Sequence, residues 1–540
     1  MISHKRARLL FLGLFGAAVS VVCSSSYITP GILTATAEAA LAEGTPLPTA
    51  FFIFPSSTVT SEPTASETPD PFLFTPTPEI DTATATVEPT PFPTSTLLDA
   101  SGPPFSYTSQ SGDTLDALAS RFGVNPIEIV SPDPIPAKGL INPGQFLLIP
   151  WRMGNTTPAE RILPDSEIVY SASVSDFDVV TYVNTLGGYL STYRDYLGSG
   201  GWMSGGDIVQ RVAVENSINP RILLALLEYQ GNWVLGRPNN LSETDYPMGY
   251  IDSQSEGLFP QLIWAVNQLS SGYYGWRGGT MVELYGIDGS SIRIAPQLNA
   301  GSVAIQYFFN KLYAGDQWRQ AVDSQGNFVA LYNDMFGGDP WLRAAQVEPL
   351  FPPGLTQPEM ILPFLKGQRW SYTGGPHGAW KGEGSQAALD FAPGSVESGC
   401  AKSDNWVLAA SAGLVVRKGV GIIVLDLDGD GNEQTGWVLL YLHISNTEGA
   451  PVGRWMDEGA LLGNPSCEGG RSTGTHIHIA RKYNGEWIEA DNPLPFTMSG
   501  WVSHSSGTPY QGTLVKGDRV IESCTCGSFD TIIFREQDEP

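Results

Sequence analysis

Four of the six histidines in the 540-residue chain lie between positions 377 and 478, namely His377, His443, His476 and His478. Two of them occur in the run Thr475-His476-Ile477-His478-Ile479, in which histidine recurs with a period of two. On a β-strand this spacing projects both imidazoles from one face. Their ring nitrogens can then approach a single metal ion and its bound water.

A carboxylate lies between apolar residues in Leu389-Asp390-Phe391, where its charge is costly unless it is paired or bound to a metal. His443 ends the apolar run 439–442, which is typical of a strand, and His377 follows Gly374-Gly375-Pro376 on an expected turn-rich loop. Two imidazoles and one carboxylate, with a fourth position open, make up the ligand count of a catalytic zinc, whereas structural zinc sites are closed by four protein ligands. These residues therefore predict a catalytic rather than a structural zinc site.

The order and spacing of these blocks resemble those of the β-lytic and lysostaphin-type zinc endopeptidases, over the segment from Gly374 to about Trp501. Asp390 follows His377 by 13 residues, as in the β-lytic form of the pattern. The lysostaphin-like form has a histidine four residues before the aspartate, where this chain has Gln386. The later blocks are matched by Tyr441-Leu442-His443 and by Gly474-Thr475-His476-Ile477-His478.

This resemblance implies that His377, Asp390 and His478 bind Zn²⁺, while His443 and His476 hold or deprotonate the water and steady the oxyanion. Zinc lowers the pKa of bound water from about 15.7 to near 7, so that a neutral imidazole can take its proton. The implied activity is endopeptidase cleavage in the peptide stems or cross-links of bacterial peptidoglycan. One alternative is a catalytically silent wall-binding or regulatory protein that retains the fold, and another is cleavage of Gly-rich proteins outside the wall.

Residues 105–151 predict a small βααβ module, with an amphipathic helix from Leu115, a second helix at Asn125-Pro126 and a closing strand Phe146–Ile149. It resembles a lysin motif (LysM) domain, most specifically in Gly112-Asp113-Thr114-Leu115 and Pro143-Gly144-Gln145, and departs from the family at Val130-Ser131-Pro132. The resemblance implies binding to N-acetylglucosamine-containing glycans such as peptidoglycan. The alternative is a module of the same fold that has lost its affinity for sugar.

Residues 155–365 predict a mainly helical domain, in which Asn219-Pro220 starts an apolar helix that runs to Gln230. The region resembles the start of a lysozyme-like domain, whose helix ends in a catalytic Glu. Here Gln230 stands in that place and cannot donate a proton, and Glu228 lies about 200° away around the helix. We therefore expect no glycosidase chemistry, and either an inactive glycan-binding relative or an unrelated helical domain.

The N-terminal residues predict export. A basic stretch before the apolar run Leu9–Val22 is typical of a signal peptide, although an uncleaved anchor or a lipid on Cys23 are alternatives. The Pro-, Thr- and Ser-rich segment that follows predicts a disordered tether. The net charge of −26 argues against nucleic acid or an anionic membrane surface as a partner. We expect a secreted or cell-envelope-associated, extracytoplasmic protein, in which the N-terminus is the only segment expected to be able to anchor it to a membrane.

Two further features leave alternatives open. Asp426-Leu427-Asp428-Gly429-Asp430-Gly431 resembles the first half of a calcium loop, but Trp437 stands where the bidentate Glu is expected, so a hairpin tip is the other interpretation. Cys400 and Cys467 could form a disulfide, and the sequence indicates no function for Cys524 and Cys526. The expected organisation is multidomain: signal peptide or anchor, linker, LysM module, helical domain, antiparallel β metallopeptidase domain and C-terminal extension (1–43, 44–104, 105–151, 155–365, 366–502 and 503–540).

Overall fold

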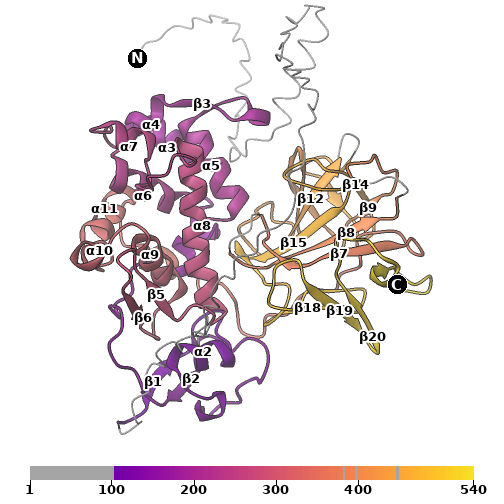
Figure 1. Cartoon of the computed structure of the whole chain (residues 1–540), viewed down its shortest axis with the longest axis horizontal. Coiled ribbons are helices and arrows are strands. Elements are labelled where there is room, and N and C mark those ends of the chain that lie inside the picture. The colour runs from indigo at the N-terminus through magenta and orange to yellow at the C-terminus, as the bar shows by residue number, and fades with distance from the viewer. Residues whose placement is uncertain (1–101, 381–383, 396–398, 446–448, 540) are drawn as a thin grey trace, which may run out of the picture.

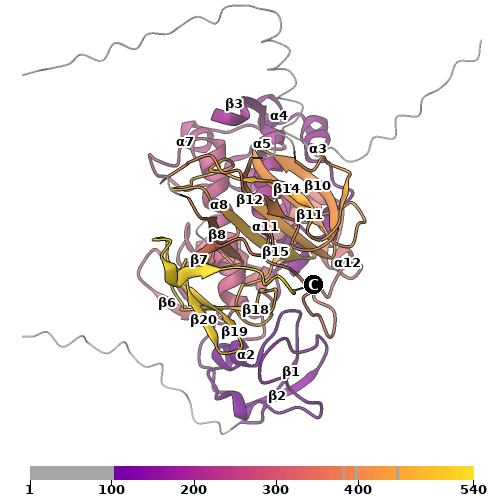
Figure 2. The same cartoon turned by 90° about the vertical axis from the view of Figure 1, so that its right-hand side faces the viewer.

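The computed structural model describes residues 102–380, 384–395, 399–445 and 449–539. A helical body and a β-rich body lie side by side, and a small module lies at one end of helix α8 (Figure 1). Seen from the β-rich side, strands β10, β11, β12 and β15 lie in front of helices α8 and α11 (Figure 2). The expected leader and nearly all of the expected tether lie outside the described residues. Within the described ranges, no helix is long and apolar enough to cross a membrane.

The small module pairs strand β1 (Phe105–Thr108) antiparallel with β2 (Phe146–Ile149), and helix α2 (Leu115–Phe122) follows β1. The expected second helix is wrong, because only a single 3₁₀ turn, η1 (Pro126–Glu128), forms there. The cause lies just after it: Val130 exchanges both backbone hydrogen bonds with Leu148 on β2, so the chain becomes extended after one turn.

The helical body carries ten α-helices and two short hairpins within the described residues, and α6 is buried on nearly every side, as its sequence predicts. These elements are α3 (Val179–Leu186), α4 (Tyr189–Thr192), α5 (Gly205–Asn216), α6 (Pro220–Gly231), α7 (Leu241–Asp245), α8 (Leu258–Arg277), α9 (Ala300–Asn310), α10 (Gly315–Ala321), α11 (Asn327–Phe336) and α12 (Pro340–Ala344), with hairpins β3 (Arg194–Tyr196) to β4 (Trp202–Ser204) and β5 (Glu283–Tyr285) to β6 (Ser291–Arg293).

The β-rich body is built on an antiparallel sheet whose main path runs β13-β10-β11-β12-β15-β8-β7-β21, with β14, β9 and β16 joined to it. Its strands are β7 (Trp370–His377), β8 (Ala388–Pro393), β9 (Val407–Leu408), β10 (Gly413–Gly419), β11 (Gly421–Asp426), β12 (Trp437–Ser445), β13 (Trp455–Met456), β14 (Leu461–Pro465), β15 (Ile477–Tyr483), β16 (Glu486–Trp487) and β21 (Ile532–Ile533). A second sheet contains β17 (Thr497–Met498), β18 (Trp501–Ser505), β19 (Gly512–Lys516) and β20 (Arg519–Glu522).

Residues 503–540 do not form a separate extension. The expected boundary falls inside strand β18, which pairs with both β17 and β19. Farther along, β21 pairs with β7 at the edge of the main sheet. The C-terminal residues therefore complete the β-rich body.

The two faces of the main sheet have different neighbours. On one face, Tyr441, Ile477 and Ile479 pack into the core of the β-rich body. On the other face, Leu440 and Ala480 belong to the same apolar core as the helices. Because neighbouring strand residues alternate between faces, the helical body packs on this second face of strands β12 and β15 through Leu440 and Ala480.

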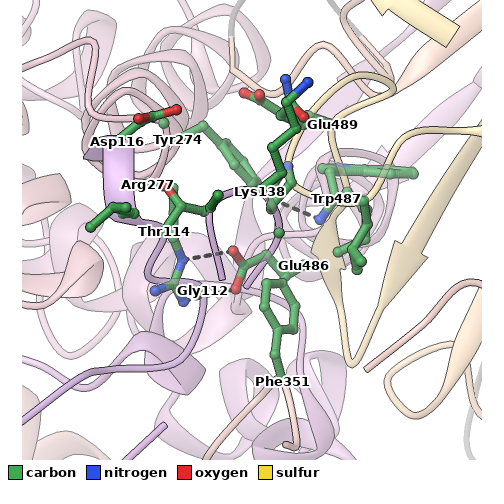
Figure 3. Close-up of a pocket in the computed structure, with 18 residues that line it drawn as sticks. Gly112, Thr114, Asp116, Lys138, Tyr274, Arg277, Phe351, Glu486, Trp487 and Glu489 are labelled. Carbon is green, nitrogen blue, oxygen red and sulfur yellow. Dashed lines mark hydrogen bonds and ion pairs between the residues drawn. The ribbon is translucent and has the colours of Figure 1, made fainter. Parts of the chain in front are cut away.

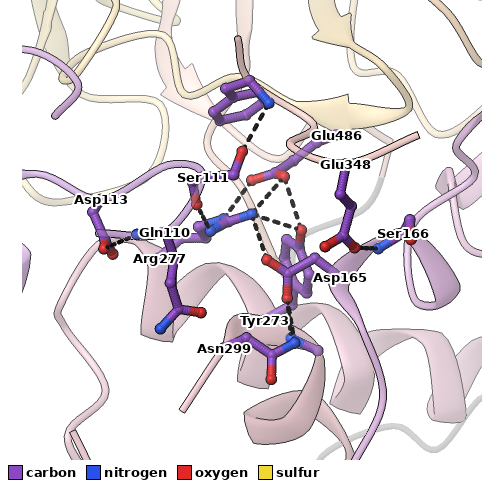
Figure 4. A network of polar contacts seen from close by, with 12 residues as sticks. Gln110, Ser111, Asp113, Asp165, Ser166, Tyr273, Arg277, Asn299, Glu348 and Glu486 are labelled. Carbon is purple, nitrogen blue, oxygen red and sulfur yellow. Dashed lines mark hydrogen bonds and ion pairs between the residues drawn. The ribbon is translucent and has the colours of Figure 1, made fainter. Parts of the chain in front are cut away.

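Arg277, at the end of α8, lies where the three parts of the protein meet. Its guanidinium pairs with Glu486 on β16 at 2.8 Å, beside a cavity (Figure 3). It also pairs with Asp165 of the helical body at 2.9 Å and donates to the carbonyl of Ser111 in the small module (Figure 4). A Cβ at Gly112 would lie 2.8 Å from this guanidinium, so the glycine of the LysM-like motif permits the close approach.

A partly buried carboxyl in the same network predicts a pH effect on stability. Burial, together with the charge of Asp165, raises the pKa of Glu348 to about 7, and its carboxylate accepts a hydrogen bond from the Ser166 amide at 2.9 Å. The folded-state pKa is above the unfolded one, so this group costs stability progressively as pH rises from about 4.5 to about 7.

Glu348→Gln is therefore expected to stabilise the protein more at pH 8 than at pH 5, with a gain that grows by up to about 2 kcal/mol. Glutamine keeps the acceptor oxygen and resembles the protonated carboxyl. Urea unfolding of both forms at the two pH values measures the gain. A variant that is less stable than the original at pH 8 would contradict the assignment.

Candidate metal centre

Four neighbouring strands bring the predicted residues together. Asp390 on β8 lies directly opposite His478 on β15, and His478 lies opposite Leu442 on β12, next to His443. His377 is the last residue of β7, and His476 immediately precedes β15. The structure thus gathers all five predicted side chains at one end of these strands.

The three predicted ligands form a tight triangle. The Nε2 atom of His377 lies 3.0 Å from Nδ1 of His478, and each of these nitrogens lies 3.2 Å from Oδ1 of Asp390. A tetrahedral metal with bonds of about 2.0–2.1 Å would separate its ligand atoms by about 3.3 Å. The triangle therefore matches one face of a zinc coordination sphere.

Backbone carbonyls fix how the two ligand imidazoles are oriented. His377 uses Nδ1 toward the carbonyl of Gly375 at 2.7 Å, and His478 uses Nε2 toward the carbonyl of Ala379 at 2.9 Å. Because a carbonyl only accepts, these nitrogens carry the hydrogens, and the facing nitrogens of neutral rings carry lone pairs. The Oδ1 atom of Asp390 is also buried without a hydrogen-bond donor. Three facing lone pairs need a cation among them.

The electrostatics of the triangle also favour a positive charge. Burial alone would raise the pKa of Asp390, but His377 and His478 hold it well below its usual range. Burial likewise opposes protonation of His377, yet the charge of Asp390 raises its pKa. A proton on His377 would satisfy only one of the facing pairs, whereas a divalent cation satisfies all three. The donor set therefore fits a metal ion.

His443 and His476 flank the triangle without joining it. Their rings lie 4.5 Å apart, and Nε2 of His476 is 3.8 Å from Oδ2 of Asp390. Each Nδ1 donates to a backbone carbonyl, from His443 to Glu468 at 2.8 Å and from His476 to Gly474 at 2.7 Å. Nε2 of each ring is therefore the acceptor. Burial and the nearby His476 lower the pKa of His443 to about 4, so this ring is neutral at pH 7.

Two local expectations are wrong. His377 ends a strand rather than lying on a loop. Strand β7 stays paired with β8 up to His377, and register shifts on both sides of Gly374 accommodate the Gly-Gly-Pro sequence. His443 lies within β12, which continues to Ser445, and has a φ of 60°. Such left-handed backbone is strained for a non-glycine residue and is typical of functional sites.

The sequence gives no signal for one further residue at the site. The ring of Tyr510 stacks on His377 with a centroid separation of 4.1 Å. Its amide donates to the carbonyl of Pro376 at 3.0 Å, and its carbonyl accepts from Gly375 at 2.8 Å. Tyr510 therefore braces the segment that presents His377, although it belongs to residues for which no role was expected.

The structure also shows the contacts of the cysteines and of the acidic hairpin Asp426–Asp430. Cys400 and Cys467 form a disulfide, and Cys524 pairs with Cys526, so no cysteine described by the structure is free to bind metal. Asp426 accepts hydrogen bonds from the amides of residues 428, 429 and 431 at the tip of the β11–β12 hairpin. These bonds account for Asp426 as a turn-forming residue, while oxygens of Asp426, Asp428 and Asp430 are close enough to share an ion.

In the helical body, Glu228 and Gln230 are engaged in structural contacts. The carboxylate of Glu228 accepts from the amides of Val234 and Leu235, both at 2.8 Å. The side-chain oxygen of Gln230 accepts from the Tyr313 hydroxyl at 2.6 Å. Glu228 therefore caps the end of α6.

Parts of the chain are similar to known proteins. Residues 161–350 match the family described as the LasA N-terminal domain. Protease LasA of Pseudomonas aeruginosa is 25% identical over 292 residues, which cover 50% of this chain and 64% of that protein. Over part of its length the chain is thus similar to the LasA-type metallopeptidases.

The β-lytic metalloendopeptidase of Achromobacter lyticus is 27% identical over 166 residues, covering 29% of this chain and 40% of that protein. The chain thus spans between two fifths and two thirds of the length of these first curated relatives. Among solved structures, the M23 metalloprotease pseudoalterin is 24% identical with a TM-score of 0.28, covering 33% of this chain and all of that one. The residues matched by the LasA N-terminal domain, 161–350, fall within the predicted helical domain, 155–365.

Proposed function

We propose that the protein is an extracytoplasmic zinc metalloendopeptidase that hydrolyses peptide bonds in bacterial peptidoglycan. The observation that carries the proposal is the triangle of His377, Asp390 and His478, whose facing atoms lie 3.0–3.2 Å apart, close to the spacing of ligand atoms around one zinc ion. The relationship to proteins named as metalloendopeptidases supports the reaction class.

In this proposal His377, Asp390 and His478 hold Zn²⁺, which when bound polarises a carbonyl and lowers the pKa of its water. In the neutral rings the carbonyls of Glu468 and Gly474 hold the hydrogen on Nδ1, so Nε2 of His443 or His476 is the atom that can accept the proton of the attacking water. The ring that takes this proton becomes an imidazolium ion and can then donate a hydrogen bond to the oxyanion. Tyr510 keeps the His377 ring in place.

The proposal that the bacterial cell wall is the substrate rests on the small module. Residues 105–151 adopt a strand, helix, turn and strand arrangement that is compatible with the LysM resemblance. We propose that this module binds N-acetylglucosamine-containing glycan and so raises the concentration of the peptidase at the wall. The expected leader and tether would place both outside the cytoplasm.

The test combines metal analysis with the release of amines from purified peptidoglycan. We expect about one zinc per chain, new amino termini, and different fragment masses or a lower yield when His476 is replaced by alanine. Zinc without turnover would instead support the silent wall-binding protein. Identical fragments in equal yield from both forms would refute the role of His476. New reducing sugar ends that disappear in Gln230→Ala would point to glycan cleavage by the helical domain.

A further inference from the structure

A disulfide joins two loops beside the metal centre. Cys467 lies just after β14, Cys400 lies between β8 and β9, and their Cα atoms are 5.7 Å apart. The last two residues of β14 pair with β12 immediately after His443, so the bridge begins close to the end of β12 that carries this histidine. The other described disulfide, between Cys524 and Cys526, closes a loop of a single residue.

The loop that contains Cys467 holds His443 at two points. The carbonyl of Glu468, the next residue, accepts the Nδ1 hydrogen of the His443 ring at 2.8 Å. On the other side of the cysteine, the amide of Ser466 donates to the backbone carbonyl of His443 at 2.7 Å. This loop therefore fixes both the backbone and the ring of His443, and it keeps the hydrogen on Nδ1 so that Nε2 can accept a proton.

The loop that contains Cys400 holds the residue before His476. The amide of Thr475 donates to the carbonyl of Gly399 at 3.0 Å, and the Thr475 hydroxyl donates to the carbonyl of Ala401. These two carbonyls flank Cys400 in the chain. The second loop therefore positions the backbone from which the His476 ring projects.

The metal ligands are anchored elsewhere. His377, Asp390 and His478 lie on the neighbouring strands β7, β8 and β15. The carbonyls that orient the two ligand rings belong to β7 and to the residues just after it. None of these anchoring contacts comes from either disulfide-bearing loop. The bridge thus constrains the two flanking histidines, while the sheet holds the ligand triangle.

We propose that the Cys400–Cys467 disulfide positions His443 and His476 for proton transfer, and that it makes turnover, but not zinc binding, sensitive to small thiols. The inference rests on the proposed peptidase function, which gives these two histidines their proton-handling role. Without the bridge, the two loops are free to shift relative to each other. A misplacement of about 1 Å can cost about 100-fold in rate, so a small shift is enough to slow the reaction.

The bridge is open to reaction with a small thiol. Cys400 is exposed, whereas Cys467 is partly buried. The thiolate of a low-molecular-weight thiol attacks Sγ of Cys400 and displaces Cys467 as a thiolate. A second thiolate then attacks the small-molecule sulfur of the mixed disulfide and releases Cys400. Two small thiols are oxidised to one disulfide, and their two protons and two electrons pass to the two cysteines.

The first test removes the bridge from the full chain. Cys400→Ala with Cys467→Ala leaves no thiol there that could bind zinc. We expect kcat for peptidoglycan hydrolysis to fall about 10- to 100-fold, with KM little changed and one zinc per chain retained. Cys524→Ala with Cys526→Ala is the matched control and should keep kcat. Loss of zinc, or an unchanged kcat, in the variant without the Cys400–Cys467 bridge would overturn the proposal.

Reduction of the original protein by glutathione gives the same comparison without a substitution. It should lower kcat by a similar factor, and reoxidation should restore it. The variant without the Cys400–Cys467 bridge should not respond, although it still contains the other disulfide. An equal response of that variant would assign the thiol sensitivity to Cys524 and Cys526 and would refute the proposal.

A double-mutant cycle separates positioning from a general effect on the fold. In a protein with His443→Ala and His476→Ala, no proton-handling ring remains to be misplaced. Removing the bridge from this protein should therefore have little further effect on its residual activity. A bridge that only stabilises the fold would instead lower activity by the same factor in both backgrounds, which would contradict the positioning role.

Hydrogen exchange tests the bridge without turnover. The amides of Ser466 and Thr475 attach the two loops to the histidine-bearing segments, so both should exchange faster when the bridge is absent. The amide of Gly375, on the strand that carries His377, donates to the Tyr510 carbonyl at 2.8 Å and should stay protected. An oxidised protein without any turnover would refute the proposed function. Equal protection of the two loop amides in both forms would refute the present inference, whether or not peptidoglycan is cleaved.

Discussion

Replacing His443 by alanine is expected to lower kcat for peptidoglycan hydrolysis by about 100- to 10,000-fold while leaving one zinc bound per chain. His443 is neutral at pH 7 because burial and His476 lower its pKa to about 4, and its Nδ1 is occupied by the Glu468 carbonyl. It can therefore take a proton through Nε2, but it lies outside the ligand triangle. Removing it should stop proton transfer without removing a ligand.

Measuring zinc content together with kcat separates proton transfer by His443 from metal binding. His478→Ala removes a corner of the triangle, so we expect loss of both zinc and activity. His504 offers a matched control, because its side chain is 45% exposed and pairs with Asp491 rather than with a residue of the triangle. His504→Ala should keep zinc content and kcat. A His443→Ala variant that loses its zinc would show that His443 is a ligand, contrary to the assignment.

The part of the site that depends on local pattern could be predicted from the sequence. The two-residue spacing of His476 and His478 requires only an extended backbone, and an aspartate between two apolar residues requires a partner wherever it is buried. Asp390 and His478 then become direct cross-strand neighbours in the structure. These features could be inferred because each follows from a few adjacent residues.

Features that depend on distant contacts could not be predicted. Nothing in the spacing of residues relates Tyr510 to His377, since their stacking depends on how the C-terminal strands fold back on β7. The second helix of the small module is lost for a similar reason, because pairing of Val130 with Leu148 outweighs a favourable helix start at Asn125. The carbonyls that orient the histidines belong to the backbone, which every residue has, so no residue type in the sequence marks them.

The junction around Arg277 is also nonlocal, and it predicts the largest effect on stability. Arg277→Met is expected to destabilise the protein by about 3 to 5 kcal/mol, because it leaves buried charges without their cation. The Arg277 side chain is 9% exposed, and those of Asp165 and Glu486 are 6% and 3% exposed. Tyr273 would still donate to Glu486, and Asn299 to Asp165, but neither of these groups carries a positive charge.

Urea unfolding measures this loss, with Arg319→Met as the matched control. Arg319 also pairs with an aspartate at 2.9 Å, but its side chain and that of Asp316 are 68% and 88% exposed. Exposed pairs contribute about 0 to 1 kcal/mol, so the control should be nearly as stable as the original protein. Similar effects from the two variants would contradict the view that burial makes Arg277 important.

A double variant and a change of pH test whether charge or lost packing is responsible. Burial already raises the pKa of Glu486, so without Arg277 this carboxyl can escape its cost by binding a proton. Arg277→Met should then cost less at pH 5 than at pH 8, and adding Glu486→Gln should recover part of the loss at pH 8. A loss that is equal at both pH values and is unchanged by Glu486→Gln would mean that Arg277 acts through the volume of its side chain. In the outcome we expect, the charge of Arg277 stabilises the contacts among the small module, the helical body and the β-rich body.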